Sequence, residues 1–164
     1  MKVFHELQKI TQWYIWIVPI CVFLIWLTAF TAQVFLDIEI GTKPATNMEL
    51  TLIGILPTLI LILLSQVRLT TVINSEIIKI SLFPFCTQEI KLNDISNVDF
   101  IKYDFVGFGC RFGTKYGVVY NLKGNLGCHI TTKQGKRFLL GTQKVEALKN
   151  HFNENKISYN FQIK

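Results

Sequence analysis

Charged side chains are missing from two stretches near the N-terminus, Ile10 to Leu36 and Leu50 to Val67. A helix needs roughly 20 mostly apolar residues to cross the hydrocarbon core of a bilayer, and both stretches are long enough to do so. Neither contains a histidine, and proton relays and ion paths usually place ionisable groups within their spans. We therefore expect an integral membrane protein with two transmembrane helices, over about 10–36 and 50–67, and neither a transporter nor a channel.

A signal-peptide cleavage site is also missing from the first stretch. The small residues around Ala29 to Ala32 do not form an Ala-x-Ala pattern, and the stretch is longer than a secretory hydrophobic region. Trp13, Tyr14 and Trp16 cluster at its start, where aromatic residues with a polar edge favour the headgroup level of a bilayer. The first helix is therefore expected to stay in the mature protein.

Flanking charges predict the orientation in an inner (cytoplasmic) membrane. Lys2 and Lys9 precede the first helix, and Arg68 follows the second. The connection Asp37 to Glu49 carries three acidic residues against Lys43 alone. Because lysine and arginine collect on the cytoplasmic side, we expect the N-terminus and the C-terminal domain in the cytoplasm and the short loop outside.

The first twelve residues place Phe4, Leu7 and Ile10 at helical spacing. This spacing predicts either a short amphipathic segment along the membrane interface or a continuation of the first helix. The chain then divides into residues 1–67, which hold this lead-in and the two helices, and a cytoplasmic domain over residues 68–164.

Patterns for metal binding and catalysis are absent as well. The domain after the helices has three cysteines without a CxxC pair, and the three histidines of the chain lie far apart in sequence: Cys86, Cys110 and Cys128, and His5, His129 and His151. We expect no metal, no cofactor and no enzymatic activity, and the unpaired cysteines suit a reducing compartment.

The charge of the domain is positive, with 14 Lys and Arg residues against 7 Asp and Glu residues from Arg68 onward. Such an excess can attract an anionic membrane surface or a nucleic acid. The basic residues are scattered rather than clustered, which favours a generally cationic surface. We expect no nucleic-acid partner.

From Arg68 the hydrophobic pattern has a period of two, typical of half-buried strands. It predicts strands at about 68–74, 77–83, 86–91, 98–104, 117–122, 126–132 and 137–141, with a helical turn between the third and fourth capped by Asn93 or Asp94. A helix with Thr142 as N-cap follows, in which Val145, Leu148 and Phe152 form an apolar stripe. Seven short antiparallel strands closed by a C-terminal helix indicate a bent barrel of α+β class, like a pleckstrin-homology (PH) domain.

Several short motifs resemble those of a family of small, mostly uncharacterised bacterial membrane proteins, which have two N-terminal helices and a PH-like C-terminal domain. These motifs are Phe83-Pro84-Phe85, Gly107-Phe108-Gly109-Cys110-Arg111, Tyr120-Asn121, Gly124 with Gly127, and Gly141-Thr142-Gln143. The chain departs from the family at Phe108, where the resemblance implies tryptophan, and at Cys110, where it implies an aliphatic residue. The resemblance implies a fold, a membrane location and a structural role for Tyr120, Gly124, Gly127, Gly141, Thr142 and Gln143.

The segment from Phe105 to Tyr116 is the most unusual part of the domain, because it combines glycines, phenylalanines and cations. It is expected to be a loop, and its candidate ligand or partner residues are Phe105, Gly107, Phe108, Gly109, Arg111, Phe112 and Lys115. In one interpretation the phenylalanines insert into a membrane or partner while Arg111 binds an anion. In the other they cover one mouth of the barrel and Arg111 pairs with Asp99 or Asp104.

The C-terminal tail alternates apolar and polar residues from Ile157 to Ile163, which predicts an extra strand. This strand is expected to pair within its own domain, although a terminal strand can also extend the sheet of a second copy.

Two functions follow from these features. The first is a non-enzymatic, membrane-anchored binding or scaffold module whose PH-like domain engages a protein partner or another copy of the chain. The alternative is a sensor that reads anionic lipid headgroups through the cationic domain.

Overall fold

The computed structural model describes residues 3–104, 106–154 and 160–162. The chain forms two compact units. One is a pair of helices within residues 10–66, and the other is a β-rich domain built from residues up to Lys9 and from Val67 onward. The sequence-based division placed residues 1–9 with the helices instead. The N-terminal segment and the C-terminal part thus share one hydrophobic core.

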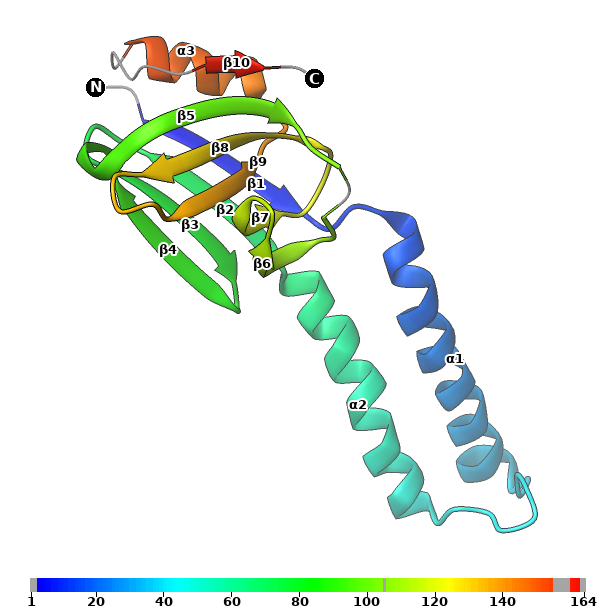
Figure 1. Ribbon diagram of the computed structural model, residues 1–164. Helices are drawn as coiled ribbons and strands as arrows, with labels where there is room; N and C mark the ends of the chain where they lie inside the picture. The colour runs from blue at the N-terminus through cyan, green and yellow to red at the C-terminus, as the bar shows by residue number, and fades with distance from the viewer. Residues whose placement is uncertain (1–2, 105, 155–159, 163–164) are drawn as a thin grey trace. The chain divides into compact units, whose positions relative to one another are not determined.

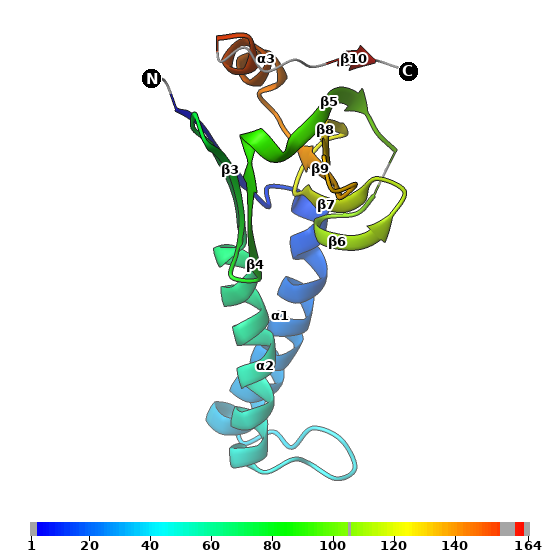
Figure 2. The same cartoon turned by 60° about the vertical axis from the view of Figure 1, so that its left-hand side comes forward.

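The helical unit consists of α1 (Trp13–Leu36) and α2 (Asn47–Gln66), which lie side by side in Figures 1 and 2. Both helices are long and apolar enough to cross a membrane. Trp26 packs directly on Gly54, where an added Cβ would come within 2.0 Å of the indole ring. The Trp26 indole N–H also donates a hydrogen bond to the carbonyl oxygen of Leu50, at 2.8 Å. A glycine therefore allows the two helices to approach closely.

Thr46 and Glu49 form a capping box at the start of α2. The Glu49 carboxylate accepts hydrogen bonds from the Thr46 backbone N–H and hydroxyl at 2.8 and 3.0 Å, and the Glu49 N–H donates to the Thr46 hydroxyl at 3.3 Å. These bonds satisfy backbone donors that the first turn of a helix leaves unpaired. Helix α2 begins three residues before the predicted span for this reason.

The first sheet of the β domain has the order β1-β2-β3-β4 and is antiparallel throughout. Its strands are β1 (Phe4–Lys9), β2 (Arg68–Ile73), β3 (Ile77–Phe83) and β4 (Cys86–Lys91). Strand β1 replaces the expected amphipathic helix, so both helical interpretations of this segment are wrong. It pairs with β2 over its whole length, from Phe4 opposite Ile73 to Lys9 opposite Arg68.

The polar residues of β1 explain why its period of two was missed. The inward-facing positions are Phe4, Glu6 and Gln8, and the latter two bury polar side chains. Glu6 is only 2% exposed. A strand that buries a carboxylate and an amide does not show the alternation of apolar residues by which strands are recognised in a sequence.

The second sheet has the order β10-β5-β8-β9-β7-β6. Its strands are β5 (Ile95–Lys102), β6 (Gly109–Thr114), β7 (Gly117–Asn121), β8 (Leu126–Thr132), β9 (Arg137–Gly141) and β10 (Asn160–Gln162). The pairs β7–β9 and β10–β5 are parallel, so the expectation of an antiparallel barrel is corrected at these two places. Strand β10 pairs within its own domain, as expected of the tail, whose residues 157–159 and 163 lie outside the described residues.

All seven predicted strands are present within a few residues, as β2, β3, β4, β5, β7, β8 and β9. The short 3-10 helix Leu92–Asp94 occupies the predicted helical turn, but neither Asn93 nor Asp94 caps it, because its N-cap position is Lys91. Helix α3 (Val145–Glu154) follows β9, and Figure 2 shows it beyond the end of the second sheet. Its residues Leu148 and Phe152 are fully buried, as the apolar stripe predicts.

Candidate functional site

The segment expected to be a loop is largely a β-hairpin. Strand β6 pairs with β7 from Gly109 opposite Asn121 to Thr114 opposite Gly117, and the register shifts between Arg111 and Thr114. Such a shift is the mark of a β-bulge, which redirects side chains away from the regular ladder. Within the described sheet β6 is an edge strand, since β7 is its only neighbour.

Phe112 lies in this irregular part of β6 and is 74% exposed. It does not cover the mouth of the barrel, so that interpretation is wrong for this residue. Phe108 is half-buried, and Phe105 lies outside the described residues. The aromatic that does close this end of the core is Tyr116, which packs on Tyr103, Val119 and Leu139.

Arg111 is exposed and lies against the backbone of Gly107. Gly107 has a φ of +82°, and a Cβ added there would come within 2.4 Å of the Arg111 Nε. Glycine is required on both counts, because the left-handed region strains other residues and because a side chain would displace the guanidinium. Among the described residues Arg111 makes no ion pair, so its expected pairing with Asp99 or Asp104 is not found.

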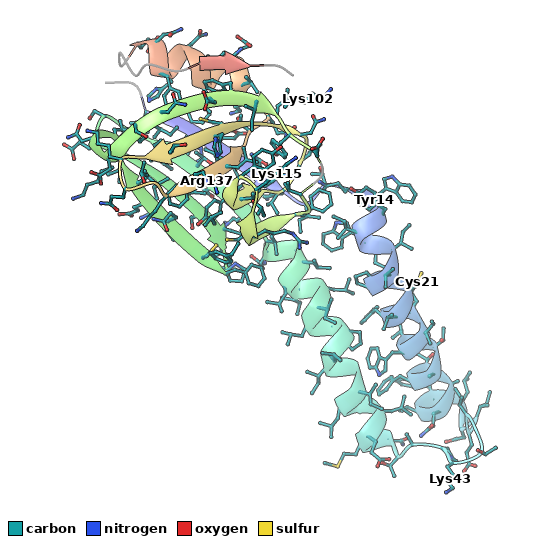
Figure 3. All side chains as sticks on the ribbon, viewed as in Figure 1. Tyr14, Cys21, Lys43, Lys102, Lys115 and Arg137 are labelled. Atoms are coloured by element: carbon teal, nitrogen blue, oxygen red, sulfur yellow. The ribbon has the colours of Figure 1, made fainter. Side chains whose placement is uncertain are left out.

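The two carboxylates have other partners. The Asp104 carboxylate accepts a hydrogen bond from the Lys115 ammonium at 2.8 Å, and the Asp99 carboxylate accepts one from the Asn97 side chain at 2.7 Å. The hydrogen bond between Lys115 and Asp104 raises the pKa of the lysine and lowers that of the aspartate. Lys115 stands at the turn of the hairpin, where Figure 3 labels it. An exposed pair of this kind contributes little to stability.

The motif residues that follow β7 in the chain pack around the short connection between β9 and α3. Gln143 donates through its side chain to the Lys123 carbonyl and through its backbone N–H to Glu6, the latter at 2.7 Å. Gly124 has a φ of +81°, and an added Cβ would come within 2.7 Å of the Gln143 amide. A Cβ at Gly127 would meet the Leu140 carbonyl at 2.7 Å, and one at Gly141 would meet Asn121 and the Tyr103 hydroxyl.

Thr142 lies in the same connection. It is not the N-cap residue predicted from the sequence, because α3 begins at Val145. Its hydroxyl donates to the Glu6 carboxylate at 2.5 Å and accepts from the Lys144 backbone N–H at 3.0 Å. Gln8 donates to Glu6 at 3.1 Å and to the Gly141 carbonyl at 2.8 Å. Glu6 and Gln8 were absent from the sequence-based candidates, because nothing local in a sequence signals a contact across more than 130 residues.

Tyr120 belongs to a different cluster, with Cys86 of β4 and Cys110 of β6. Both the Cys86 thiol and the Tyr120 hydroxyl lie close enough to the Cys110 thiol to affect its pKa. Burial, together with the Cys86 thiol, raises the pKa of Cys110 to about 11. Burial and the two thiols also raise the pKa of Tyr120 above its usual range. Cys110 and Tyr120 are therefore protonated and neutral at physiological pH.

A second exposed surface lies at one end of the first sheet. Arg68 is the cross-strand partner of Phe83, and its guanidinium carbon sits 5.0 Å from the centre of that ring. Phe85, in the turn between β3 and β4, is 65% exposed. An exposed aromatic pair beside an arginine suits the headgroup region of a bilayer.

A cavity of about 460 Å³ lies between the start of α3 and the second sheet. Its lining includes Phe100, Leu126 and Val145 together with Gln143, Lys144 and Lys149. Phe100 is also the register partner of Phe161, so β10 pairs with the strand that contributes to this lining. No group of three or more metal-ligating side chains occurs in the described residues here or elsewhere.

No protein-family model and no curated protein sequence matches the chain. A comparison with solved structures finds a chain of the structure titled "Structure of the Spt16D Pob3N heterodimer", with a TM-score of 0.38 and 11% sequence identity. The match covers 61% of this chain and 47% of that chain, so it spans about half of the matched protein. A likeness at this TM-score carries no conclusion about function.

Proposed function

We propose that the protein is a membrane-anchored binding module whose PH-like domain captures an extended, acidic segment of a partner protein along strand β6. The single observation that carries this proposal is the pair Arg111 and Phe112 on an edge strand: a cation without an ion pair in the described part of the chain, and an exposed aromatic ring. An edge strand offers unpaired backbone groups to an added strand, and the neighbouring side chains then select its sequence.

The chemistry of the partner follows from charge. The domain carries a clear excess of basic residues, and the cations labelled in Figure 3 on the β domain are Lys102, Lys115 and Arg137. Since Lys115 is engaged by Asp104, Arg111 is the cation of the hairpin that is available to a partner carboxylate. Aromatic and arginine side chains are the residues most often found at the energetic centre of interfaces.

The anchoring half of the proposal is supported by the pairing of Lys9 with Arg68. These residues flank the two apolar helices in the chain, and they are neighbours in one ladder. Two segments that pair in one sheet must lie on the same side of a membrane, which requires an even number of crossings between them. Together with the flanking charges, this supports a cytoplasmic N-terminus and a cytoplasmic domain.

The test is site-specific photo-crosslinking of the full chain in its native membrane. A benzophenone side chain placed at Phe112 should capture one discrete protein through an acidic peptide, and Arg111→Glu should abolish that adduct because the charge is reversed. A probe at Lys133, which is exposed at the end of β8, is the matched control and should not capture it. Equal capture at both positions, or capture that survives Arg111→Glu, would contradict the proposal.

A second function, contact with anionic lipid, is favoured by the exposed Phe83 and Phe85 beside Arg68. Arg68 follows the last residue of α2 by two positions in the chain. A probe at Phe85 in nanodiscs should then yield more lipid adducts with anionic than with neutral lipid, and the difference should fall with added salt. Equal yields in the two lipids would exclude this function.

A further inference from the structure

Two cysteines that are distant in sequence point into the same part of the β domain. Cys86 is the cross-strand partner of Leu82, and Cys110 is the cross-strand partner of Tyr120. Directly opposed residues of an antiparallel pair share one face of the sheet. Leu82 and Tyr120 are both buried, so each thiol shares a face of its sheet with a buried side chain.

Strand β6 approaches the first sheet near Cys86. A Cβ built on Gly109, the residue before Cys110, would be in van der Waals contact with the Leu82 side chain at 3.8 Å. Leu82 is in turn the register partner of Cys86. The effect of Cys86 and Tyr120 on the pKa of Cys110 agrees with this geometry.

Accessibility separates this pair from Cys128, and position in the chain separates it from Cys21. Cys86 and Cys110 are half-buried, so a small reagent can reach them. Cys128 is fully buried, and Cys21 lies in α1, in a different structural unit. The described structure therefore offers one pair of thiols that are both near each other and open to a dissolved reagent.

We propose that Cys86 and Cys110 are a modification site that forms a reversible disulfide between the two sheets, by exchange with a low-molecular-weight disulfide such as oxidised glutathione. A bond there would join β4 of the first sheet to β6 of the second. Because Cys110 directly precedes Arg111 and Phe112, the bond would also restrain the strand that carries the candidate binding residues.

The exchange needs no other oxidant. One cysteine thiolate attacks a sulfur of the small disulfide, forms a mixed disulfide and releases one thiolate, which takes up a proton. The second cysteine thiolate then attacks the protein sulfur of the mixed disulfide and expels the second small thiolate, which is protonated in turn. Two protein thiols and one small disulfide thus give one protein disulfide and two small thiols.

The rate of this exchange depends on pH. The raised pKa of Cys110 leaves little thiolate at neutral pH, and only the thiolate attacks. Formation of the disulfide should therefore accelerate by about tenfold per pH unit from pH 7 to 9 wherever attack by Cys110 limits the rate.

The test uses the full chain in detergent micelles, treated with oxidised glutathione and analysed by non-reducing peptide mapping. The free thiols should fall from four to two per chain, one linked peptide pair should contain Cys86 and Cys110, and dithiothreitol should restore all four. Cys21→Ser is the matched control and should leave the linked pair in place. Cys86→Ser should abolish the link and leave Cys110 free or bound to glutathione.

Three results would overturn the proposal. They are separate, persistent glutathione adducts on Cys86 and Cys110 of the wild-type chain, a disulfide between two chains, and no loss of either thiol under conditions that oxidise the unfolded chain. Circular dichroism of Cys86→Ser and Cys110→Ser shows whether each variant retains the β domain. The wild-type result decides the matter even if a variant does not fold.

Discussion

Glu6 accepts a hydrogen bond from the hydroxyl of Thr142 at 2.5 Å, although 136 positions separate the two residues in sequence. The same carboxylate accepts the backbone N–H of Gln143 at 2.7 Å. The first strand of the chain therefore holds the segment that leads into α3. Glu6 and Thr142 are each 2% exposed, so the bond between them is shielded from solvent.

Replacing Glu6 with alanine should lower the free energy of unfolding of the β domain by about 2–3 kcal/mol, because it leaves the buried Thr142 hydroxyl and the backbone N–H of Gln143 without an acceptor. Glu6→Gln retains one acceptor oxygen and should cost less. The exposed neighbour His5 provides the control, since His5→Ala should change stability little. Denaturant titrations of the three variants in the same detergent provide the comparison, and equal stability of Glu6→Ala and His5→Ala would contradict the role assigned to the carboxylate.

Tyr103→Phe should leave the domain as stable as the wild type or stabilise it by about 1 kcal/mol. The Tyr103 hydroxyl is buried without a hydrogen-bond partner in the described structure, and burial raises its pKa to about 12. Removing it eliminates an unsatisfied polar atom and keeps the ring that packs on Val119 and Leu139. The measurement is the thermal unfolding midpoint, and a clear fall would show that the hydroxyl has a partner that matters.

The stability of the domain should depend on pH through His129 and His151. Burial lowers the pKa of both imidazoles below the usual value of about 6.5. The unfolded chain therefore binds protons more readily than the folded chain, and stability is fully present above pH 6.5 and is lost as the pH falls through the lower folded values. Unfolding midpoints at pH 7.5, 6.5 and 5.5 should decrease in that order, and the decrease should be smaller in His129→Gln.

Gly54→Leu should separate α1 from α2, because even a Cβ at this position overlaps the Trp26 ring. We expect loss of the hydrogen bond from Trp26 to Leu50 and a lower thermal midpoint of the helical unit. Ile53→Leu, at the exposed neighbouring position, is the volume-matched control. Trp26 fluorescence in a Trp13→Phe, Trp16→Phe background reports the change, and identical spectra for the two variants would refute the close packing.

The alternation of apolar residues was sufficient to locate the strands whose inner face is apolar, such as β3 and β8, because burial imposes a period of two on them. It failed for β1, whose inner face includes Glu6 and Gln8, and for β6, whose glycines at 109 and 113 contribute no hydrophobic signal. Local patterns also could not predict the parallel pairing of β7 with β9.

Much of the candidate site could be predicted as a set of residue types but not as an arrangement. Arg111 and Phe112 were recognised because their segment combines glycines, phenylalanines and cations. The ion pair was not predicted correctly, because the partner of Asp104 is Lys115 and not Arg111. The proximity of Cys86 to Cys110 depends on how two sheets meet, and nothing in the spacing of those residues encodes it. Such contacts follow from topology, which a single sequence reveals only weakly.

The position of β1 in the chain also sets an order of events during synthesis. The ribosome makes β1 first, but its partner β2 emerges only after both apolar helices have been made. The partners of Glu6 and Gln8, which lie at residues 141–143, are made later still. The domain can therefore close only after α1, α2 and the segment through α3 have been translated. Any protease that cut between the two helices would separate the domain from one of its own strands.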